Sequence, residues 1–382
     1  MESTIVGTAR LKRQNTGLVL GTLRAADRPM RIAEVAAETA LTRATVATIV
    51  DALERDGWVS RHAPEGALGR PALRYGIDPS RVHVIGLDLG LHRIVVELAD
   101  AAGEVLARRS EAHDLRDGDA LLALANANID AVLTEAGLAR EDVLRMTVGA
   151  VGMIDRGAGR VREVRGIRAL TELDLTDELG RGVRGVDLDN DADLAAMAMT
   201  RLDGAPASFL TVQWGERLGA GLVLDGRLYR GPAGAAGELG GLPVVDPWSG
   251  SPSQLEQVVG ANRVSEVAAR GQGIIGLFDA VARGDAEAAA ILDEVAGVVA
   301  AALAPVLLAL DLHDVFITGG MARGGETLTA ALERRLGLLG PGPRSVQLSP
   351  FLEDTVVRGA TEAALRSAWS EVLEGRLGGR HP

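Results

Sequence analysis

Two similar groups of short apolar segments, beginning near residues 82 and 208, constrain the fold of this 382-residue chain most strongly. The first group reads VHVIGLDLG, RIVVELAD and GEVLARRSEAHD, and the second reads SFLTVQW followed by GAGLVLDGRLYRG. Each group predicts apolar strands joined in a meander. After the first group come an amphipathic segment at 118–137 and a further strand, LRMTVGAVGMID, and strand and helix signals then alternate to the end. The alternation predicts α/β layers, and the repetition predicts two similar lobes with a cleft between them.

Composition narrows the class of protein further. The chain is 47% hydrophobic but only 3% aromatic, so its cores must consist mostly of Ala, Val and Leu. It has no cysteine, which excludes disulfides and thiolate metal sites and fits a reducing compartment. Its six histidines do not fall at metal-ligand spacing. We therefore expect a protein without a structural metal.

The sequence shows no signal peptide and no membrane-spanning segment. The N-terminal segment lacks the apolar stretch of a signal peptide. The most apolar run, 291–312, is interrupted by Asp293, Glu294 and Pro305, so we expect a buried helix there and not a membrane span. The sequence therefore predicts a cytoplasmic protein with no membrane partner.

Residues 1–80 have the pattern of a winged helix-turn-helix domain. The segment RIAEVAAETALTRATVATIVDALERDGWVSRH predicts two short helices and a strand, and TGLVLGTLRAA before it supplies a third helix. The strands WVSRH and ALRYGI enclose the Pro- and Gly-containing turn APEGALGRP, which would form the wing. The second helix of the segment begins at Thr42, a favourable N-cap. Its apolar face consists of Val46, Ile49, Val50 and Leu53.

The opposite face of that second helix suits DNA. It presents Thr42, Arg43, Thr45 and Thr48, whose side chains fit phosphates and base edges in a major groove. Arg70 in the wing would reach a phosphate or the minor groove. Residues 1–80 carry 11 Lys and Arg against 9 Asp and Glu, although the whole chain has a net charge of −12. We expect this domain to bind DNA, and the alternative is a winged helix used only for protein contacts.

The segment DLDNDAD, residues 187–193, places four carboxylates and one amide after a short apolar strand. Three interpretations are open: a catalytic base, a binding site for a polyol that is not chemically changed, and a solvated loop with a helix cap. For Asp187, Asp189 and Asp193 we favour carboxylates at a helix N-terminus, stabilised by the helix dipole. Asn190 and Asp191 are the candidates for a ligand role.

Six segments occur in a characteristic order along the chain: TRATVATIVDALERDGWV, GRPALRYGID, VIGLDLG, DNDADLAAMA, GAGLVLDGRLYRGPAGAAGELG and ITGG. In these segments the chain resembles the ROK family (repressor, open reading frame, kinase) over nearly its whole length. The resemblance implies an α/β fold with an actin-like ATPase (ribonuclease-H-like) body of two lobes behind the winged helix-turn-helix head. The implied domains are 1–80 for the head, 81–190 for lobe 1 and 191–355 for lobe 2, with a helix near 356–376 packing back on lobe 1. Members with an added winged helix are sugar-responsive transcriptional regulators.

The resemblance also implies roles for individual residues. In the family's sugar kinases an Asn-Asp pair grips the sugar and its Asp takes a proton from the attacking hydroxyl, and the matching pair here is Asn190-Asp191. An ionised carboxylate suits that task and equally suits the binding of sugar hydroxyls. Glu238 in GELGG matches a sugar-binding Glu of the family, and Glu256 in QLEQ matches a second one.

The chain departs from the family at the zinc site and at the phosphate hairpins. Gly241 stands where the family has a His, and VVDPWSGSPSQLE replaces the cysteine-rich zinc segment. We therefore expect no zinc and a local structure held by packing around Pro247 and Trp248. Leu91 and His92 replace the Gly and Thr of the first phosphate hairpin, and Glu216 replaces the Thr of the second, where Arg217 could turn inward and compensate. Although ITGG, 317–320, is kept, we expect that ATP does not bind.

Three functions remain open on this sequence. The first is a DNA-binding regulator, a repressor, that binds a pseudo-palindromic operator as a homodimer or dimer of dimers. It would respond to a sugar or sugar derivative in the cleft, with phosphoryl transfer lost. The second is an ATP-dependent sugar kinase with Asp191 as its base. The third is a ligand-blind DNA-binding regulator whose body serves only dimerisation.

Overall fold

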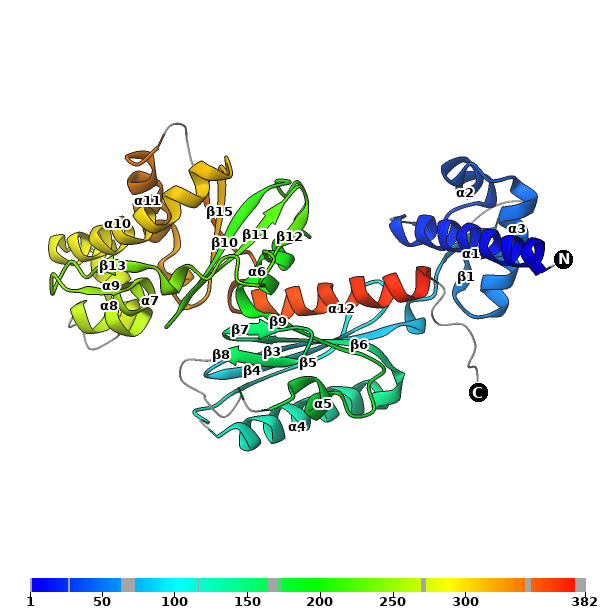
Figure 1. Ribbon diagram of the computed structural model, residues 1–382, viewed down its shortest axis with the longest axis horizontal. Coiled ribbons are helices and arrows are strands. Elements are labelled where there is room, and N and C mark those ends of the chain that lie inside the picture. The colour runs from blue at the N-terminus through cyan, green and yellow to red at the C-terminus, as the bar shows by residue number, and fades with distance from the viewer. Residues whose placement is uncertain are drawn as a thin grey trace.

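The computed structural model describes residues 2–26, 28–62, 73–115, 117–163, 171, 173–268, 273–340 and 345–374. It has three parts (Figure 1): an N-terminal head and two lobes, each built on a five-stranded sheet. The α/β architecture with two similar lobes and a helix-turn-helix head confirms the predicted fold class.

The head consists of three helices and a two-stranded sheet. Its elements are α1 (Glu2–Ala25), α2 (Ile32–Thr39), α3 (Arg43–Arg55), β1 (Val59–His62) and β2 (Arg74–Ile77). Thr42 caps α3 by accepting a hydrogen bond from the backbone N–H of Thr45, and the predicted apolar face of α3 is buried. Helix α1 begins at Glu2, well before the predicted helix TGLVLGTLRAA, and includes that segment as far as Ala25. The wing turn APEGALGRP, with Arg70, lies outside the described residues.

Lobe 1 begins with the predicted meander. Strands β3 (His83–Leu89), β4 (Arg93–Ala99) and β5 (Val105–Ala112) are antiparallel. The short 3-10 helix η1 (Pro79–Arg81) connects them to the head. Strands β6 (Val143–Ala150) and β9 (Val186–Asn190) continue the sheet in parallel, giving the order β5-β4-β3-β6-β9.

Helices cover both faces of the lobe 1 sheet. Helices α4 (Gly118–Ala136) and α5 (Leu175–Gly180) share a buried core with Ile85, Leu87 and Leu89 of β3. Helix α12 (Thr355–Leu373) packs on the opposite face, where a Cβ atom on Gly86 would lie 2.3 Å from Thr361 Oγ1. The alternation of β3 side chains between the two faces is the ordinary pattern of a strand buried on both sides.

One predicted strand of lobe 1 is wrong in its extent. The segment LRMTVGAVGMID forms two strands, β6 and β7 (Met153–Asp155), and β7 pairs with β8 (Arg160–Glu163) in a separate hairpin. Gly152 breaks the strand because it adopts a φ of 107°, a conformation that favours glycine. The break turns the chain toward the cleft, and Val151, Gly152 and Met153 line the cavity described below.

Lobe 2 repeats the strand arrangement of lobe 1. Strands β10 (Phe209–Trp214), β11 (Leu218–Leu224) and β12 (Arg227–Tyr229) form the antiparallel meander, and β15 (Asp314–Thr318) and β16 (Ser345–Leu348) extend it in parallel. The order β12-β11-β10-β15-β16 matches that of lobe 1 position by position. The predicted repeat of the meander is therefore confirmed.

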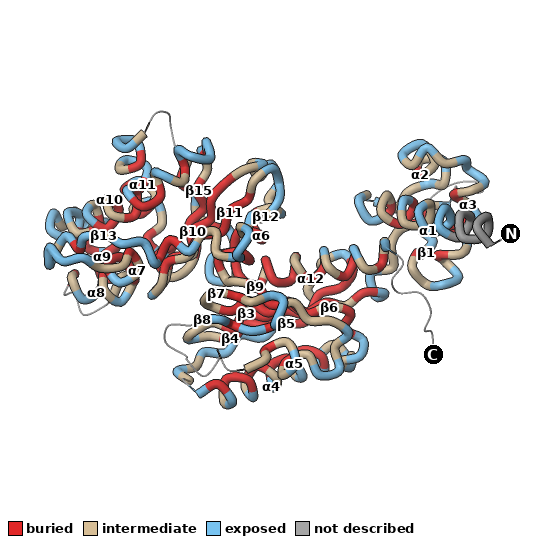
Figure 2. The backbone as a smooth tube through the Cα atoms, viewed as in Figure 1, coloured by how far each residue is buried: buried red, intermediate tan, exposed pale blue. Residues whose placement is uncertain are grey.

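The remaining elements of lobe 2 surround this sheet. They are α6 (Asp191–Met199), β13 (Pro243–Val245), β14 (Pro252–Gln254), α7 (Leu255–Val259), α8 (Ala261–Ala268), α9 (Gly273–Ala282), α10 (Ala286–Ala309) and α11 (Gly325–Gly337), with the 3-10 helices η4 (Leu239–Gly241), η5 (Gly320–Gly324) and η6 (Leu352–Asp354). Figure 2 shows that the buried residues follow the two sheets and the helices packed on them.

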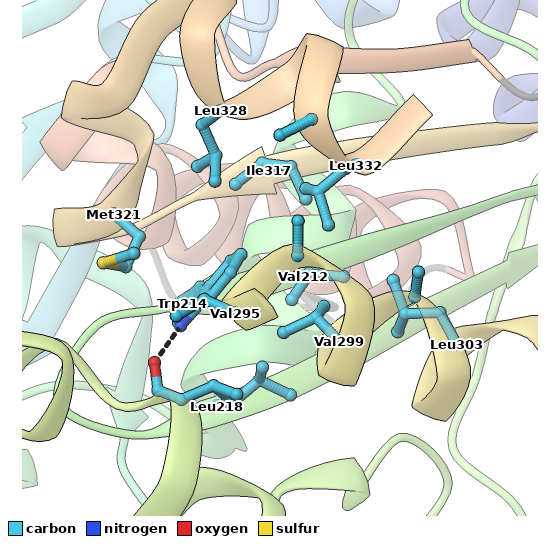
Figure 3. Close-up of a cluster of buried hydrophobic side chains, with 14 of the residues drawn as sticks. Val212, Trp214, Leu218, Val295, Val299, Leu303, Ile317, Met321, Leu328 and Leu332 are labelled. Carbon is cyan, nitrogen blue, oxygen red and sulfur yellow. Dashed lines mark hydrogen bonds between the residues drawn. The ribbon is translucent and has the colours of Figure 1, made fainter. Parts of the chain in front are cut away.

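Helix α10 contains most of the apolar run at 291–312. By length and composition it is the one helix in the described part of the chain that could cross a membrane. In the structure Val295, Val299 and Leu303 of α10 pack into the lobe 2 core with Val212 and Trp214 of β10 (Figure 3). The buried indole of Trp214 donates a hydrogen bond to the carbonyl of Val259 at 2.8 Å. The core packing explains the apolar face of this helix.

Candidate functional site

A cavity of about 460 Å³ lies between the two lobes. Lobe 1 contributes Asp88, the turn at 90–93 and the segment at 151–153. Lobe 2 contributes the turn at 215–217, the start of β11 at 218–220, and Gly319 and Gly320. The four residues predicted to bind an effector all line this cavity: Asn190, Asp191, Glu238 and Glu256. Its volume is in the usual range for small-molecule sites.

Asn190 stands at the junction of β9 and α6. Its Oδ1 accepts hydrogen bonds from the backbone N–H groups of Ala192 at 2.8 Å and Asp193 at 3.2 Å, so it is the N-cap of α6. Its Nδ2 donates to the carbonyl of Gly152 at 3.0 Å. The helix cap and the cavity lining are therefore properties of the same side chain, and the amide is held in a fixed orientation.

Asp191 and Asp88 form the acidic centre of the cavity. Burial, with a contribution from the charge of Glu238, raises the pKa of Asp191 to about 6. Burial and the neighbouring charge of Asp191 raise the pKa of Asp88 to about 7. Each carboxyl disfavours ionisation of the other, as expected for two acids in one poorly solvated site. A carboxyl with a pKa near 6 suits either proton transfer or the binding of hydroxyl groups.

Close glycine packing brings Glu238 to the cavity. Gly237 has a φ of 89°, and a Cβ atom there would lie 1.7 Å from the carbonyl oxygen of Ala220. A Cβ atom on Gly240 would lie 2.2 Å from the carbonyl oxygen of Leu218. The segment GELGG therefore lies directly against β11, which only residues without a Cβ atom permit. Gly241, in the position of the family's His, has open space around it: nothing lies within 4 Å of an added Cβ.

The two hairpins that correspond to phosphate-binding hairpins touch each other. His92, from the turn between β3 and β4, lies with Nε2 at 3.0 Å from Oε1 of Glu216, in the turn between β10 and β11. Arg217, which the sequence suggested could turn inward, lines the cavity. Its Nη1 lies 4.0 Å from Oε1 of Glu256. The two residues that replace the Thr of each hairpin thus form a polar contact between the lobes.

The segment that replaces the zinc motif is a short hairpin of β13 and β14. Trp248 is half-buried against the lobe 2 core, and the guanidinium of Arg263 lies 5.9 Å from its ring centroid. Asp246, which is 8% exposed, accepts a hydrogen bond from the backbone N–H of Trp248 at 2.8 Å. The expected packing around Trp248 is present, whereas the expectation for Pro247 is wrong because that ring is exposed. Within the described ranges no group of three or more His, Asp or Glu could hold a metal.

The interpretation of Asp187, Asp189 and Asp193 as plain helix N-terminal carboxylates needs correction. Asp187 and Asp189 lie in β9, before the helix. Asp193 is in the first turn of α6, as expected, but it is only 5% exposed and its Oδ2 lies 3.6 Å from Arg230 Nε.

Asp189 is the residue of this segment that the sequence did not single out. It is 3% exposed and binds the Arg230 guanidinium through both carboxylate oxygens, with Nε to Oδ1 at 3.2 Å. Arg156 Nη1 approaches Asp189 Oδ2 at 3.4 Å. Arg230 follows β12 of lobe 2, so this ion-pair cluster joins the lobes directly beneath the Asn190 turn. The alternation of Asp with apolar residues in the segment VDLD was the available signal.

The predicted DNA-contacting face of α3 is accessible. Thr42, Arg43 and Thr48 are exposed, and Thr45 is half-buried. The hydroxyls of Thr42 and Thr45 lie 2.8 Å apart, and Thr48 Oγ1 donates to the carbonyl of Ala44 at 3.0 Å. These side chains are brought together on one face, whereas Arg70 lies outside the described residues.

The fold and the cleft define a ribonuclease-H-like, actin-like body of two lobes with an attached helix-turn-helix head. Residues 84–339 match the model of the ROK family, and residues 14–63 match the IclR helix-turn-helix domain. The chain belongs to the ROK family.

Relatives of this chain include both kinases and repressors. It is 26% identical over 279 residues to a glucokinase of Halalkalibacterium halodurans, covering 65% of this chain and 84% of the relative. It is 26% identical over 205 residues to a xylose repressor of Caldicellulosiruptor bescii, covering 52% of this chain and 51% of the relative. A solved ROK family transcriptional regulator, a homologue of the E. coli Mlc protein, superposes with a TM-score of 0.77 at 22% identity, covering 96% of this chain and 99% of that one.

Proposed function

We propose that this chain is a cytoplasmic DNA-binding transcriptional repressor controlled by a sugar or sugar derivative in the interlobe cleft. The observation that carries the proposal is the convergence of Asn190, Asp191, Glu238 and Glu256 on one cavity. The accessible face of α3 supports DNA binding, and the relatives include a xylose repressor.

The chemistry of the cavity suits a polyol. Three of the four residues are carboxyl groups, whose ionised forms only accept hydrogen bonds, and the fourth is an amide. A sugar offers several hydroxyl donors at once. Arg217, Arg93 and His92 are set against carboxylates within the same lining, so the cavity has no net positive charge that would favour an anionic ligand.

The same lining supports the loss of phosphoryl transfer. A triphosphate needs cationic groups, backbone N–H groups and Mg²⁺ around its oxygens. Here the turn of the second hairpin presents the Glu216 carboxylate, and that carboxylate contacts His92 of the first hairpin. A carboxylate beside a triphosphate is repulsive, and the contact with His92 holds it at the junction of the hairpins.

Regulation would follow from the position of the ligand between two lobes. A ligand with higher affinity for one degree of cleft closure shifts the population toward that state. In a homodimer or dimer of dimers the shift would change the spacing of two heads on a pseudo-palindromic operator.

A second candidate function is supported by one specific observation. The pKa of Asp191, raised to about 6 mainly by burial, would suit a general base in an ATP-dependent sugar kinase. The glucokinase relative is consistent with it. Steady release of ADP that requires both a sugar and Asp191 would establish this function in place of the first.

Thermal unfolding with a carbohydrate panel tests the proposed ligand site. A ligand that binds the native state raises the Tm of the protein. We expect at least one carbohydrate to raise the Tm of the wild type and of the control Asp203→Asn, which alters an exposed carboxylate outside the cavity. Asp191→Asn should lose the shift. Retention of the shift in Asp191→Asn contradicts the site, and a panel without any shift favours the ligand-blind regulator.

A further inference from the structure

Helix α12 connects the cleft to the head. In Figure 1 it is the red helix that runs from the two lobes toward the head. Its first half packs against α6, the helix that begins at the Asn190 turn, and its second half enters the hydrophobic core of the head. Helix α12 thus contacts both α6, which begins at the proposed ligand site, and the head.

The contact between α12 and α6 is made by backbone as well as side chains. Val356 and Ala360 of α12 pack with Leu194 and Ala195 of α6. A Cβ atom on Gly359 would lie only 1.7 Å from the carbonyl oxygen of Leu194. Two helix backbones this close have no layer of side chains between them to absorb a displacement. A movement of α6 is therefore passed directly to α12.

Polar contacts lock the far end of α6 to the same helix. The side chain of Glu362 is 7% exposed and accepts a hydrogen bond from Arg366 Nε at 2.6 Å. Arg201, just after α6, lies with Nε at 3.5 Å from Glu362 Oε2. Arg366 Nη2 donates to Thr200 Oγ1 at 2.9 Å. The middle of α6 and the residues just after its C-terminal end are thus both held on α12.

Trp369 is the joint between α12 and the head. It is 1% exposed, and its Nε1 donates to the carbonyl of Ala101 in lobe 1 at 3.2 Å. Its hydrophobic cluster includes Val19, Leu20 and Leu23 of α1. The guanidinium of Arg24 lies 5.0 Å from the Trp369 ring centroid, within range of a cation–π interaction.

Among the described residues, the buried side chains of the head belong to one hydrophobic cluster with those of α12. The cluster that contains Trp369 and Val372 of α12 also contains Val46, Ile49 and Val50 of the DNA-binding helix α3. A Cβ atom on Gly17 of α1 would lie 3.0 Å from the carbonyl oxygen of Leu373, so α1 and the end of α12 are also close at the backbone. The orientation of α3 is therefore set by α12 in addition to the covalent connection through η1.

We propose that α12 transmits the conformation of the turn at Asn190 and Asp191 to the head. Trp369 and Arg24 are the residues that position the head on the C-terminal end of α12. The inference rests on the proposed function, because it assumes that the head binds DNA. Coupling between two sites is reciprocal. DNA bound at α3 must then alter α12 and α6 as much as a ligand at α6 alters DNA binding.

Reciprocity allows a test with DNA alone. Amide hydrogen exchange is measured on the full chain with and without a 30-base-pair duplex of random sequence at low salt, where non-specific binding is strong. We expect slower exchange in α3, from direct contact. In the wild type, exchange in α6 (Asp191–Met199) and α12 (Thr355–Leu373) should also change by about fivefold or more, the lower range of coupling free energies.

Two matched arginine variants distinguish a specific role of the Trp369 contact from a general effect on protein stability. Arg24→Gln and Arg263→Gln each remove an arginine from the face of a tryptophan, at Trp369 and at Trp248 respectively. We expect Arg24→Gln to keep the protection of α3 and to reduce the response of α6, while Arg263→Gln leaves both unchanged. Trp369→Phe should also reduce the α6 response, because the smaller ring fills less of the cluster and cannot donate the hydrogen bond to Ala101.

The outcomes of this experiment distinguish transmission through α12 from DNA binding by the head. Protection of α3 with unchanged exchange in α6 and α12 of the wild type overturns the inference and leaves DNA binding intact. An equal loss in Arg24→Gln and Arg263→Gln also overturns it. If α3 itself is not protected, the head does not bind the duplex, and the proposed function fails together with the inference.

Discussion

His92 Nε2 lies 3.0 Å from Glu216 Oε1, so the first hairpin of lobe 1 touches the first hairpin of lobe 2 across the cleft. Both side chains are substantially exposed, at 49% and 37%. A polar contact between side chains this exposed contributes at most about 1 kcal/mol to stability. We propose that the contact matters more for function than for stability, because it places a carboxylate in the hairpin that corresponds to a phosphate-binding hairpin of the family's kinases.

The first prediction concerns nucleotides. Wild-type protein with Mg²⁺ and a non-hydrolysable ATP analogue should show no rise in Tm, because Glu216 repels the phosphates and Leu91 restricts close backbone approach. A ROK glucokinase measured in parallel provides the positive control. A clear, saturable rise in the Tm of this chain would contradict the account of the hairpins.

The second prediction concerns the ion-pair cluster beneath the ligand turn. Arg230→Met leaves the buried carboxylates of Asp189 and Asp193 without this cation and should lower the free energy of unfolding by about 3–5 kcal/mol. Arg227→Met, at an exposed arginine in β12, the strand just before Arg230, should change it by less than about 0.5 kcal/mol. Urea unfolding of the two variants measures the difference. Equal effects would show that Arg230 is not a specific partner.

The third prediction concerns pH. The pKa of Asp88 is raised from 3.8 to about 7 in the folded protein, chiefly by burial, so the folded state binds more protons than the unfolded state between those values. The contribution of Asp88 to the free energy of unfolding therefore falls as pH rises from about 4 to about 7.

Asp88→Asn tests this sign directly. It removes the buried charge and should stabilise the protein at pH 8 by about 1–2 kcal/mol, with a smaller gain at pH 5, where the wild-type carboxyl is already protonated. Asp203→Asn, at an exposed position, is the control. A gain that is the same at both pH values would contradict the raised pKa.

The fourth prediction concerns the DNA-binding face of α3. Arg43→Gln should weaken DNA binding by about 1–3 kcal/mol if Arg43 reads a base. If it contacts a phosphate, the salt dependence of log K should fall by about one unit. Anisotropy titrations at several salt concentrations distinguish the two roles. Arg283→Gln, on the surface of lobe 2, should have no effect, and an Arg43→Gln variant with unchanged binding would remove this residue from the interface.

Much of the fold was predictable because its signals are local. The doubled meander, the Thr42 cap and the apolar face of α3 depend on residues close together in the chain, and the structure confirms all three. The strand break at Gly152 was missed because an apolar segment with glycine is also compatible with a continuous strand.

The candidate site was predictable only where a motif carried it. Asn190, Asp191, Glu238 and Glu256 were selected by resemblance, and the fold brings all four to one cavity. The pairing of Asp189 with Arg230 joins residues 41 positions apart, and no periodicity in the sequence indicates that these two side chains meet. The packing of Trp369 in the head depends on contacts between the two ends of the chain and was missed for the same reason.

The central claim is that one ligand in the cleft controls DNA binding by the head. The most direct measurement is fluorescence anisotropy of the purified protein on DNA from its own upstream region, at fixed salt because phosphate contacts make affinity salt-dependent, with a carbohydrate panel added. The account predicts sequence-selective binding that one carbohydrate weakens in the wild type but not in Asp191→Asn. Selective binding that the same carbohydrate weakens equally in wild type and Asp191→Asn would contradict it.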